Sequence, residues 1–173
     1  EDECYKRLKA KHFLTITEEK EQVLGLLAIK LRTRKAFAEC SPNLHMIVAT
    51  LRCNCLCKYC HASSIDMSAK QYDMGWETAR KTIDLIFQSP SDDIKIEYQG
   101  GEPLLNWDIV KESILYAKFV NKIARKNLSF VICTNLMQIS KEQIDFFKKH
   151  SIEISTSLDG PKQLHDTNRK SRI

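Results

Sequence analysis

The chain has 173 residues, 43% of them hydrophobic and 28% charged, which fits one soluble domain with a buried core. No apolar run approaches the roughly 20 residues that cross a bilayer, and the first residues lack the basic and apolar pattern of a signal peptide. The formal net charge is +5, and the basic residues are scattered over helical stretches and both ends. We therefore expect a cytoplasmic protein with no membrane partner, and the charge pattern does not favour nucleic acid.

Residues 1–45 predict a small N-terminal extension. Residues 14–17 have the profile of a short strand, and residues 18–32 place apolar side chains among charges in the manner of an amphipathic helix. The basic run at residues 32–35 is either a binding patch for an acidic peptide or a solvated linker. Two cysteines of this region have no nearby partner and are interpreted as single thiols: Cys4 and Cys40.

From residue 46 onward, short branched apolar runs alternate with segments of helical periodicity. The first run, 46–51, is typical of a parallel strand covered on both faces. Asp73 is the expected cap of the first helix, and Ser140 to Gln143 form a capping box. Strands are expected at 46–51, 94–98, 128–133 and 152–156, and helices at 75–88, 106–126 and from Ser140 onward.

Strands that alternate with helices build a parallel sheet, because each parallel return needs a crossover, which is right-handed. Four such units are two-thirds of a six-stranded partial barrel and half of an eight-stranded one. We therefore expect an α/β fold with residues 46–173 as a barrel core that stops after about four β/α units, preceded by the extension 1–45. Since the chain does not begin with Met and stops soon after a loop, we expect it to be part of a longer protein.

The segment Cys53-Asn54-Cys55-Leu56-Cys57-Lys58-Tyr59-Cys60 follows the first expected strand and holds four of the seven cysteines. An odd number of thiols, crowded into one loop, argues against a disulfide framework and favours reduced, metal-binding thiols. Thiolates bind iron and zinc tightly, and such a short loop can wrap three of them around one centre. A structural zinc site of all four thiols is the alternative, although zinc loops generally pair two Cys-x2-Cys knuckles a dozen or more residues apart.

The spacing Cys53-x3-Cys57-x2-Cys60, with the aromatic Tyr59 before the last cysteine, resembles the cluster motif of radical S-adenosylmethionine (SAM) enzymes. The resemblance implies that these three cysteines hold a four-iron, four-sulfur (4Fe-4S) cluster, whose remaining iron is chelated by SAM. It also implies that one electron from the cluster cleaves SAM to a 5′-deoxyadenosyl radical, which abstracts a hydrogen from a bound substrate. Cys55 is then a spare thiol, and Tyr59 is expected near the adenine.

Two further segments follow strands and share the resemblance. Gly100-Gly101-Glu102-Pro103 is a turn before a helix, or else the radical SAM segment whose glycine backbone approaches the methionine moiety while Glu102 accepts its amino group. Ser157 stands before the common turn pair Asp159-Gly160. By resemblance, Ser157 contacts the ribose and Arg169 holds the methionine carboxylate, which a guanidinium fork matches. Asn135 also falls at a strand end and is interpreted as either a ligand contact or a plain turn residue, since the family usually has Gly where Leu136 stands.

The matches cover residues 46–169, and their order resembles the radical SAM maturases that act on peptides and proteins, such as anaerobic sulfatase-maturing enzymes. Residues 33–35 and 44–53 look like the His-Xaa-Ser system maturases of bacteria. This implies an oxidoreductase that modifies a peptide or protein and takes electrons from a small protein of the flavodoxin or ferredoxin type. The alternatives are a zinc or iron-sulfur binding module without catalysis, and a radical SAM enzyme that acts on RNA or a small molecule.

Overall fold

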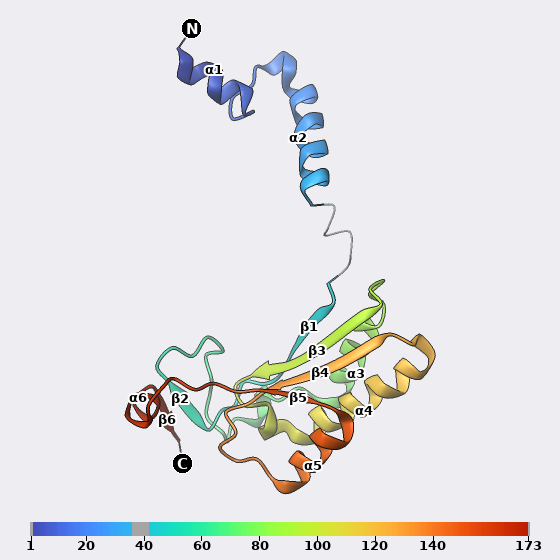
Figure 1. The fold of residues 1–173 in the computed structure, drawn as a ribbon, viewed down its shortest axis with the longest axis vertical. Coiled ribbons are helices and arrows are strands. Elements are labelled where there is room, and N and C mark those ends of the chain that lie inside the picture. The colour runs from blue at the N-terminus through green and yellow to red at the C-terminus, as the bar shows by residue number, and fades with distance from the viewer. Residues whose placement is uncertain (1, 36–41, 173) are drawn as a thin grey trace. The chain divides into compact units, whose positions relative to one another are not determined.

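The computed structural model describes residues 2–35 and 42–172 (Figure 1). The chain divides into an N-terminal unit, Glu1–Ser41, and a larger unit, Pro42–Ile173, which are described separately. The N-terminal unit contains helix α1 (Glu3–Ala10), the 3₁₀ helix η1 (Thr17–Glu19) and helix α2 (Lys20–Arg34). Neither α-helix has a buried residue.

The N-terminal unit departs from expectation in two ways. Residues 14–16 are not in a strand, and Thr17 already begins η1; a strand needs a partner to complete its hydrogen bonds. The helix expected at 18–32 is present as α2, but its apolar side chains are spread around the helix instead of gathering on one face. The basic run 32–35 falls in the last turn and C-cap of α2, Cys4 is exposed, and Cys40 lies outside the described residues.

The larger unit is built on a parallel sheet in the order β1-β3-β4-β5 (Figure 1). Its strands are β1 (Leu44–Thr50), β3 (Asp93–Gly100), β4 (Asn127–Cys133) and β5 (Glu153–Ser155). The helices α3 (Trp76–Ile86), α4 (Trp107–Ala124) and α5 (Lys141–His150) follow β1, β3 and β4 in the chain. The predicted α/β fold with four parallel strands is therefore confirmed.

All three helices pack against the same face of the sheet, as Figure 1 shows. The core between them includes side chains from the sheet and from each helix: Ile94, Ile96, Tyr98, Phe130 and Ile132, with Ile83, Val110, Ile114, Ala117, Phe146 and Phe147. Burying each large apolar side chain contributes about 1.5–3 kcal/mol before chain entropy is counted. On the opposite face Met46 is 64% exposed, so the expectation that the first strand is covered on both faces is wrong for the part of the chain described here.

Local sequence signals predicted the N-cap of α5 correctly and the N-cap of α3 incorrectly. The capping box of α5 is present, with the Ser140 hydroxyl accepting from Gln143 N at 3.1 Å and the Gln143 side chain accepting from Ser140 N at 2.8 Å. Asp73 does not cap α3, whose N-cap is Gly75. It accepts two hydrogen bonds from the Arg52 guanidinium, at 2.7 and 2.6 Å, because a buried cation provides a stronger, charge-assisted partner than a backbone amide.

Several short elements complete the larger unit. The 3₁₀ helices η3 (Lys70–Tyr72) and η4 (Pro103–Asn106) precede α3 and α4, and α6 (Lys162–Asn168) follows β5. Strands β2 (Cys55–Cys57) and β6 (Arg169–Ser171) pair antiparallel, with Cys57 opposite Arg169. This two-stranded ribbon joins the cysteine loop to the last described residues. In the described ranges, no helix has the length and apolarity needed to span a bilayer.

Candidate functional site

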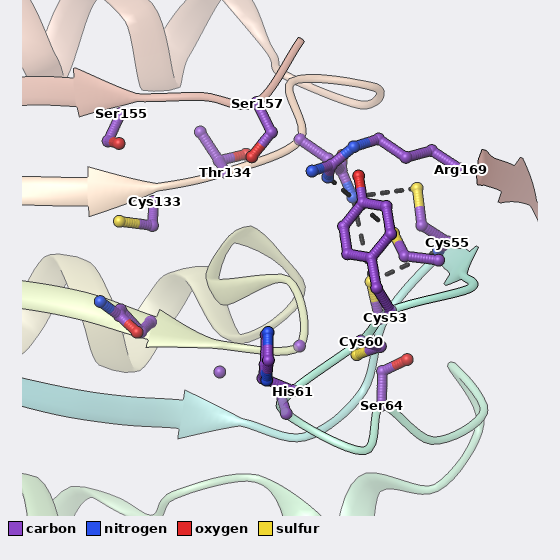
Figure 2. A pocket seen from close by; sticks show the side chains of 17 residues that line it. Cys53, Cys55, Cys60, His61, Ser64, Cys133, Thr134, Ser155, Ser157 and Arg169 are labelled. Atoms are coloured by element: carbon purple, nitrogen blue, oxygen red, sulfur yellow. Dashed lines mark hydrogen bonds between the residues drawn. The ribbon is translucent and has the colours of Figure 1, made fainter. Parts of the chain in front are cut away.

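The carboxyl ends of the parallel strands meet at a pocket of about 340 Å³ (Figure 2). In parallel α/β folds this is the edge where loops from successive strands converge. Glu102 does not line the pocket, but the other eight residues predicted for the site do: Cys53, Cys57, Tyr59, Cys60, Gly100, Gly101, Ser157 and Arg169.

The three predicted cluster ligands occupy unlike surroundings along the loop. Cys53 is buried, whereas Cys57 and Cys60 are partly exposed. Burial raises the pKa of Cys53 above its ordinary value. Burial acts in the same direction on Cys60, but hydrogen bonds from Ser64 and its neighbours outweigh it and lower the pKa of that thiol. Cys60 therefore forms a thiolate more readily than Cys53 does.

The arrangement of thiols suits a cluster better than a close-packed ion site. In the described part of the chain, no three Cys, His, Asp or Glu side chains gather closely enough to hold a single metal ion. A cubane cluster does not require this, because its three cysteine thiolates bind three separate irons. Three thiols on one loop that border the same pocket fit a ligand set of that kind.

Cys55, the fourth thiol of the loop, points into a polar and sulfur-rich corner of the pocket. Its S–H donates to Met137 Sδ at 3.1 Å, and Asn135 Nδ2 donates to its sulfur at 3.4 Å. Burial is the main cause that raises the pKa of Cys55, to about 11. At neutral pH this residue is thus a thiol with its own protein partners.

Gly100 and Gly101 allow the end of β3 to lie against the backbone that leads into the cysteine loop. Gly100 has a φ of +124°, which favours glycine. A Cβ on Gly101 would lie 2.2 Å from the Arg52 carbonyl oxygen. The close approach is sealed by hydrogen bonds from Gly101 N to Thr50 O at 2.9 Å and from Glu102 N to Arg52 O at 2.7 Å. The glycine pair therefore fixes where the cysteine loop begins.

The Glu102 carboxylate is not among the groups that line the pocket, although the resemblance predicts it there. The side chain is buried, and its two oxygens accept from Leu104 N at 3.2 Å and Asn135 N at 2.8 Å. Burial is the largest influence and raises its pKa despite these hydrogen bonds. Glu102 lines a separate small cavity beneath the loop. In this structure it braces the ends of β3 and β4.

Asn135 connects three segments around the pocket. Its side chain donates to Asn54 Oδ1 at 2.7 Å and accepts from Met137 N at 3.0 Å, while its backbone binds Glu102. Leu136 has a φ of 59°, a left-handed conformation that explains why glycine suits this position. Asn135 was interpreted as a ligand contact or a turn residue, and the structure gives it a bracing role at the pocket wall.

Arg169 reaches the pocket from β6 and meets two side chains from other loops. Its Nε donates to Asp159 Oδ1 at 2.9 Å, and its Cζ lies 5.3 Å from the centre of the Tyr59 ring. The Tyr59 hydroxyl donates to the other oxygen of Asp159. The Nη1 group of Arg169 lies 3.9 Å from Cys57 Sγ. The predicted carboxylate-binding residue is thus beside a predicted cluster ligand.

Asp159 and Cys133 are among the residues of this region that sequence reasoning missed. Asp159 was interpreted only as part of a turn, and its contacts depend on Arg169, which no local pattern reveals. Cys133 ends β4, lines the pocket and donates to Glu97 Oε1 at 3.1 Å. Its position at a strand end was the only signal for it.

These features define an α/β protein with a thiol-rich pocket at the carboxyl edge of its parallel strands. The chain belongs to the radical SAM superfamily, whose model matches residues 47–173. Membership implies a 4Fe-4S cluster and SAM as the cofactors, as predicted.

Several relatives match the same part of the chain. A cysteine-type anaerobic sulfatase-maturating enzyme of Clostridium novyi is 31% identical over 135 residues, which cover 73% of this chain and 35% of that protein. The radical SAM cyclopropyl synthase TigE of Paramaledivibacter caminithermalis is 27% identical over 132 residues, covering 69% of this chain and 27% of that protein. A solved structure described as native anSMEcpe with bound AdoMet has a TM-score of 0.64 at 25% identity, and covers 74% of this chain and 35% of that one.

These relatives support the predicted likeness to the peptide- and protein-modifying branch of the superfamily. The finer likeness to the His-Xaa-Ser system maturases stays a prediction. The chain spans less than half the length of the curated relatives it matches.

Proposed function

We propose that this chain is the cluster- and SAM-binding part of a radical SAM enzyme that modifies a residue of a peptide or protein. Support comes above all from one observation: the three cysteines, the glycine pair and Arg169 line a single pocket. Residues 46–173 are proposed as the radical SAM core and residues 1–45 as an extension. When bound, the reduced cluster supplies the electron that cleaves SAM and yields the hydrogen-abstracting radical.

The chain's own residues have separate tasks in this proposal. Cys53, Cys57 and Cys60 bind the cluster as thiolates. Arg169 pairs with the carboxylate of SAM, since a guanidinium matches that group in shape and charge. Three further groups that line the pocket are proposed for the rest of the ligand: Tyr59 beside the adenine, Ser157 at the ribose, and the backbone of Gly100 and Gly101 near the methionine moiety.

Glu102 holds the backbone amides of Leu104 and Asn135. An ionised carboxylate has about four acceptor sites, so these two hydrogen bonds leave lone pairs free. We propose that Glu102 also accepts the amino group of SAM.

The proposed substrate is a peptide or protein, and the proposed electron donor is a small protein of the flavodoxin or ferredoxin type. The names of the relatives support the substrate class, because they include sulfatase-maturating enzymes. The scattered basic residues give no footprint for RNA. A cytoplasmic location is proposed because the cysteine loop needs reduced thiols to bind iron.

The test is electron paramagnetic resonance of the full-length protein, reconstituted anaerobically and reduced with dithionite, with iron and zinc measured on the same sample. We expect a 4Fe-4S signal that changes when SAM is added. Cys57→Ala should lose this signal, whereas Cys4→Ala, an exposed thiol of the other unit, should keep it. Zinc in place of iron, or a cluster that does not respond to SAM, would refute the proposal.

A further inference from the structure

Asp159 and Arg169 form a shielded ion pair at the edge of the pocket. Their side chains are 13% and 15% exposed, and Nε of Arg169 donates to Oδ1 of Asp159 at 2.9 Å. A charge-assisted hydrogen bond with so little solvent access fixes a side chain more firmly than an exposed ion pair does. The guanidinium is therefore held by its Nε edge.

The second oxygen of Asp159 holds another wall of the pocket. It accepts the hydroxyl hydrogen of Tyr59, whose ring lies 5.3 Å from the Arg169 guanidinium. These two contacts, first Tyr59 and then Arg169, keep the pKa of Asp159 below its ordinary value. One carboxylate thus ties a residue of the cysteine loop to a residue of β6.

The backbone around Asp159 is itself anchored. Asp159 N donates to His165 Nδ1 at 3.3 Å, and His165 belongs to α6, whose C-cap is Arg169. Arg169 is paired across the ribbon with Cys57. Both members of the ion pair therefore sit on restrained backbone, and the remaining freedom lies in the torsions of the long Arg169 side chain.

Because Asp159 binds Nε, the Nη groups of the guanidinium face the cysteine loop, where Nη1 lies 3.9 Å from Cys57 Sγ. Without Asp159, the flexible side chain would lose the contact that selects this orientation. A carboxylate ligand would then have to order the guanidinium as it binds, at the expense of affinity.

We propose that Asp159 is a positioning residue that presents the Arg169 guanidinium to the carboxylate of SAM. The inference rests on the proposed function, because it requires that SAM binds in this pocket. Asp159 acts on the carboxylate through Arg169, while its contact with Tyr59 bears on the adenine side, which is common to all such ligands. Loss of Asp159 should therefore weaken ligands that carry the carboxylate more than ligands that lack it. A side chain that only maintained the fold would affect every ligand of the pocket alike.

The experiment measures dissociation constants by equilibrium dialysis on the full-length, cluster-reconstituted protein. Two ligands are compared: SAM and decarboxylated SAM, which lacks the carboxylate and is otherwise the same molecule. For Asp159→Ala we expect about 10-fold or greater weakening for SAM, the size of a lost charge-assisted contact, and a several-fold smaller weakening for decarboxylated SAM, which loses only the support that Asp159 gives to Tyr59. Arg169→Ala should show the same selectivity, and the double variant should lose little more.

Asp66→Ala is the matched control. Asp66 also pairs with an arginine near the cysteine loop, at 3.7 Å from Arg172, but its side chain is 66% exposed. Its loss should leave both dissociation constants unchanged. Asp159→Asn keeps the size and one acceptor but not the charge, and it replaces Asp159→Ala if the latter binds less iron than the wild type. This variant should show a smaller loss that is again selective for SAM.

The outcomes separate the two levels of the hypothesis. If the wild-type protein with its cluster does not bind SAM, the proposed function fails. If the wild type binds SAM but the Asp159 variants match it, or weaken both ligands equally, the positioning role is overturned while the proposed function stands.

Discussion

Gly101→Ala should destabilise the larger unit by disturbing the start of the cysteine loop. The added Cβ would lie 2.2 Å from Arg52 O and 2.6 Å from Leu51 O, about 1 Å inside normal contact. Both obstacles are backbone atoms, so no side chain can rotate away. Separating the two segments would strain the hydrogen bonds to Thr50 O and Arg52 O. With about 1–3 kcal/mol for each buried group left unpaired, we expect a loss of about 3–4 kcal/mol.

Urea unfolding followed by tryptophan fluorescence measures this change, because both tryptophans, Trp76 and Trp107, belong to the larger unit. Gly75→Ala is the control, since a Cβ there meets nothing within 4 Å and replaces only an N-cap glycine, at a cost below about 1 kcal/mol. If Gly101→Ala unfolds within about 1 kcal/mol of the wild type, the close backbone approach is not what requires glycine here.

Two further outcomes follow from the ion pair beneath the loop and from the thiol at the end of β4. Asp73→Ala leaves the Arg52 side chain, which is 8% exposed, without its carboxylate partner. The free energy of unfolding in urea should fall by about 3 kcal/mol. As a control, Glu77→Ala breaks an exposed ion pair and should lower it by less than about 0.5 kcal/mol. Burial, and then the contact with Glu97, raise the pKa of Cys133 to about 11. Alkylation of this thiol by iodoacetamide should therefore be slow at neutral pH and accelerate toward pH 11. Mass spectrometry of the digested protein measures the alkylation of the peptide that contains Cys133. Glu97→Gln should shift this acceleration to lower pH, and rapid alkylation of the folded wild type at neutral pH would contradict the assignment.

The strands were predictable because their residues carry the pattern within themselves. Ile94, Ile96 and Tyr98 alternate with polar residues, and the structure buries these three against the helices. The capping box of α5 was equally predictable, since its partners Ser140 and Gln143 lie three residues apart. The strand expected at residues 14–17 lacked a partner, which a local pattern cannot reveal.

Some features of the candidate site could be predicted from the sequence and others could not. Cysteine spacing and the glycine pair could be recognised in sequence, and the structure gathers them in one pocket. The orientation of the Glu102 side chain could not be predicted, because its hydrogen bond with Asn135 N, 33 residues away, helps to determine it. Asp73 likewise bonds Arg52, 21 residues earlier, instead of the helix that follows it. Side chains with competing partners are settled by tertiary contacts, which sequence periodicity does not carry.

The ribbon of β2 and β6 has a consequence for the order in which the protein folds. Cys57 and Arg169 are 112 residues apart, so their pairing closes a long loop, which is entropically costly until the intervening sheet has formed. We therefore expect the sheet to fold first and the ribbon to close last. Until that step, the cysteine loop has one side unrestrained and its thiols open to incoming iron and sulfide. The same strand that completes the pocket would then also end the period in which the cluster is easily inserted.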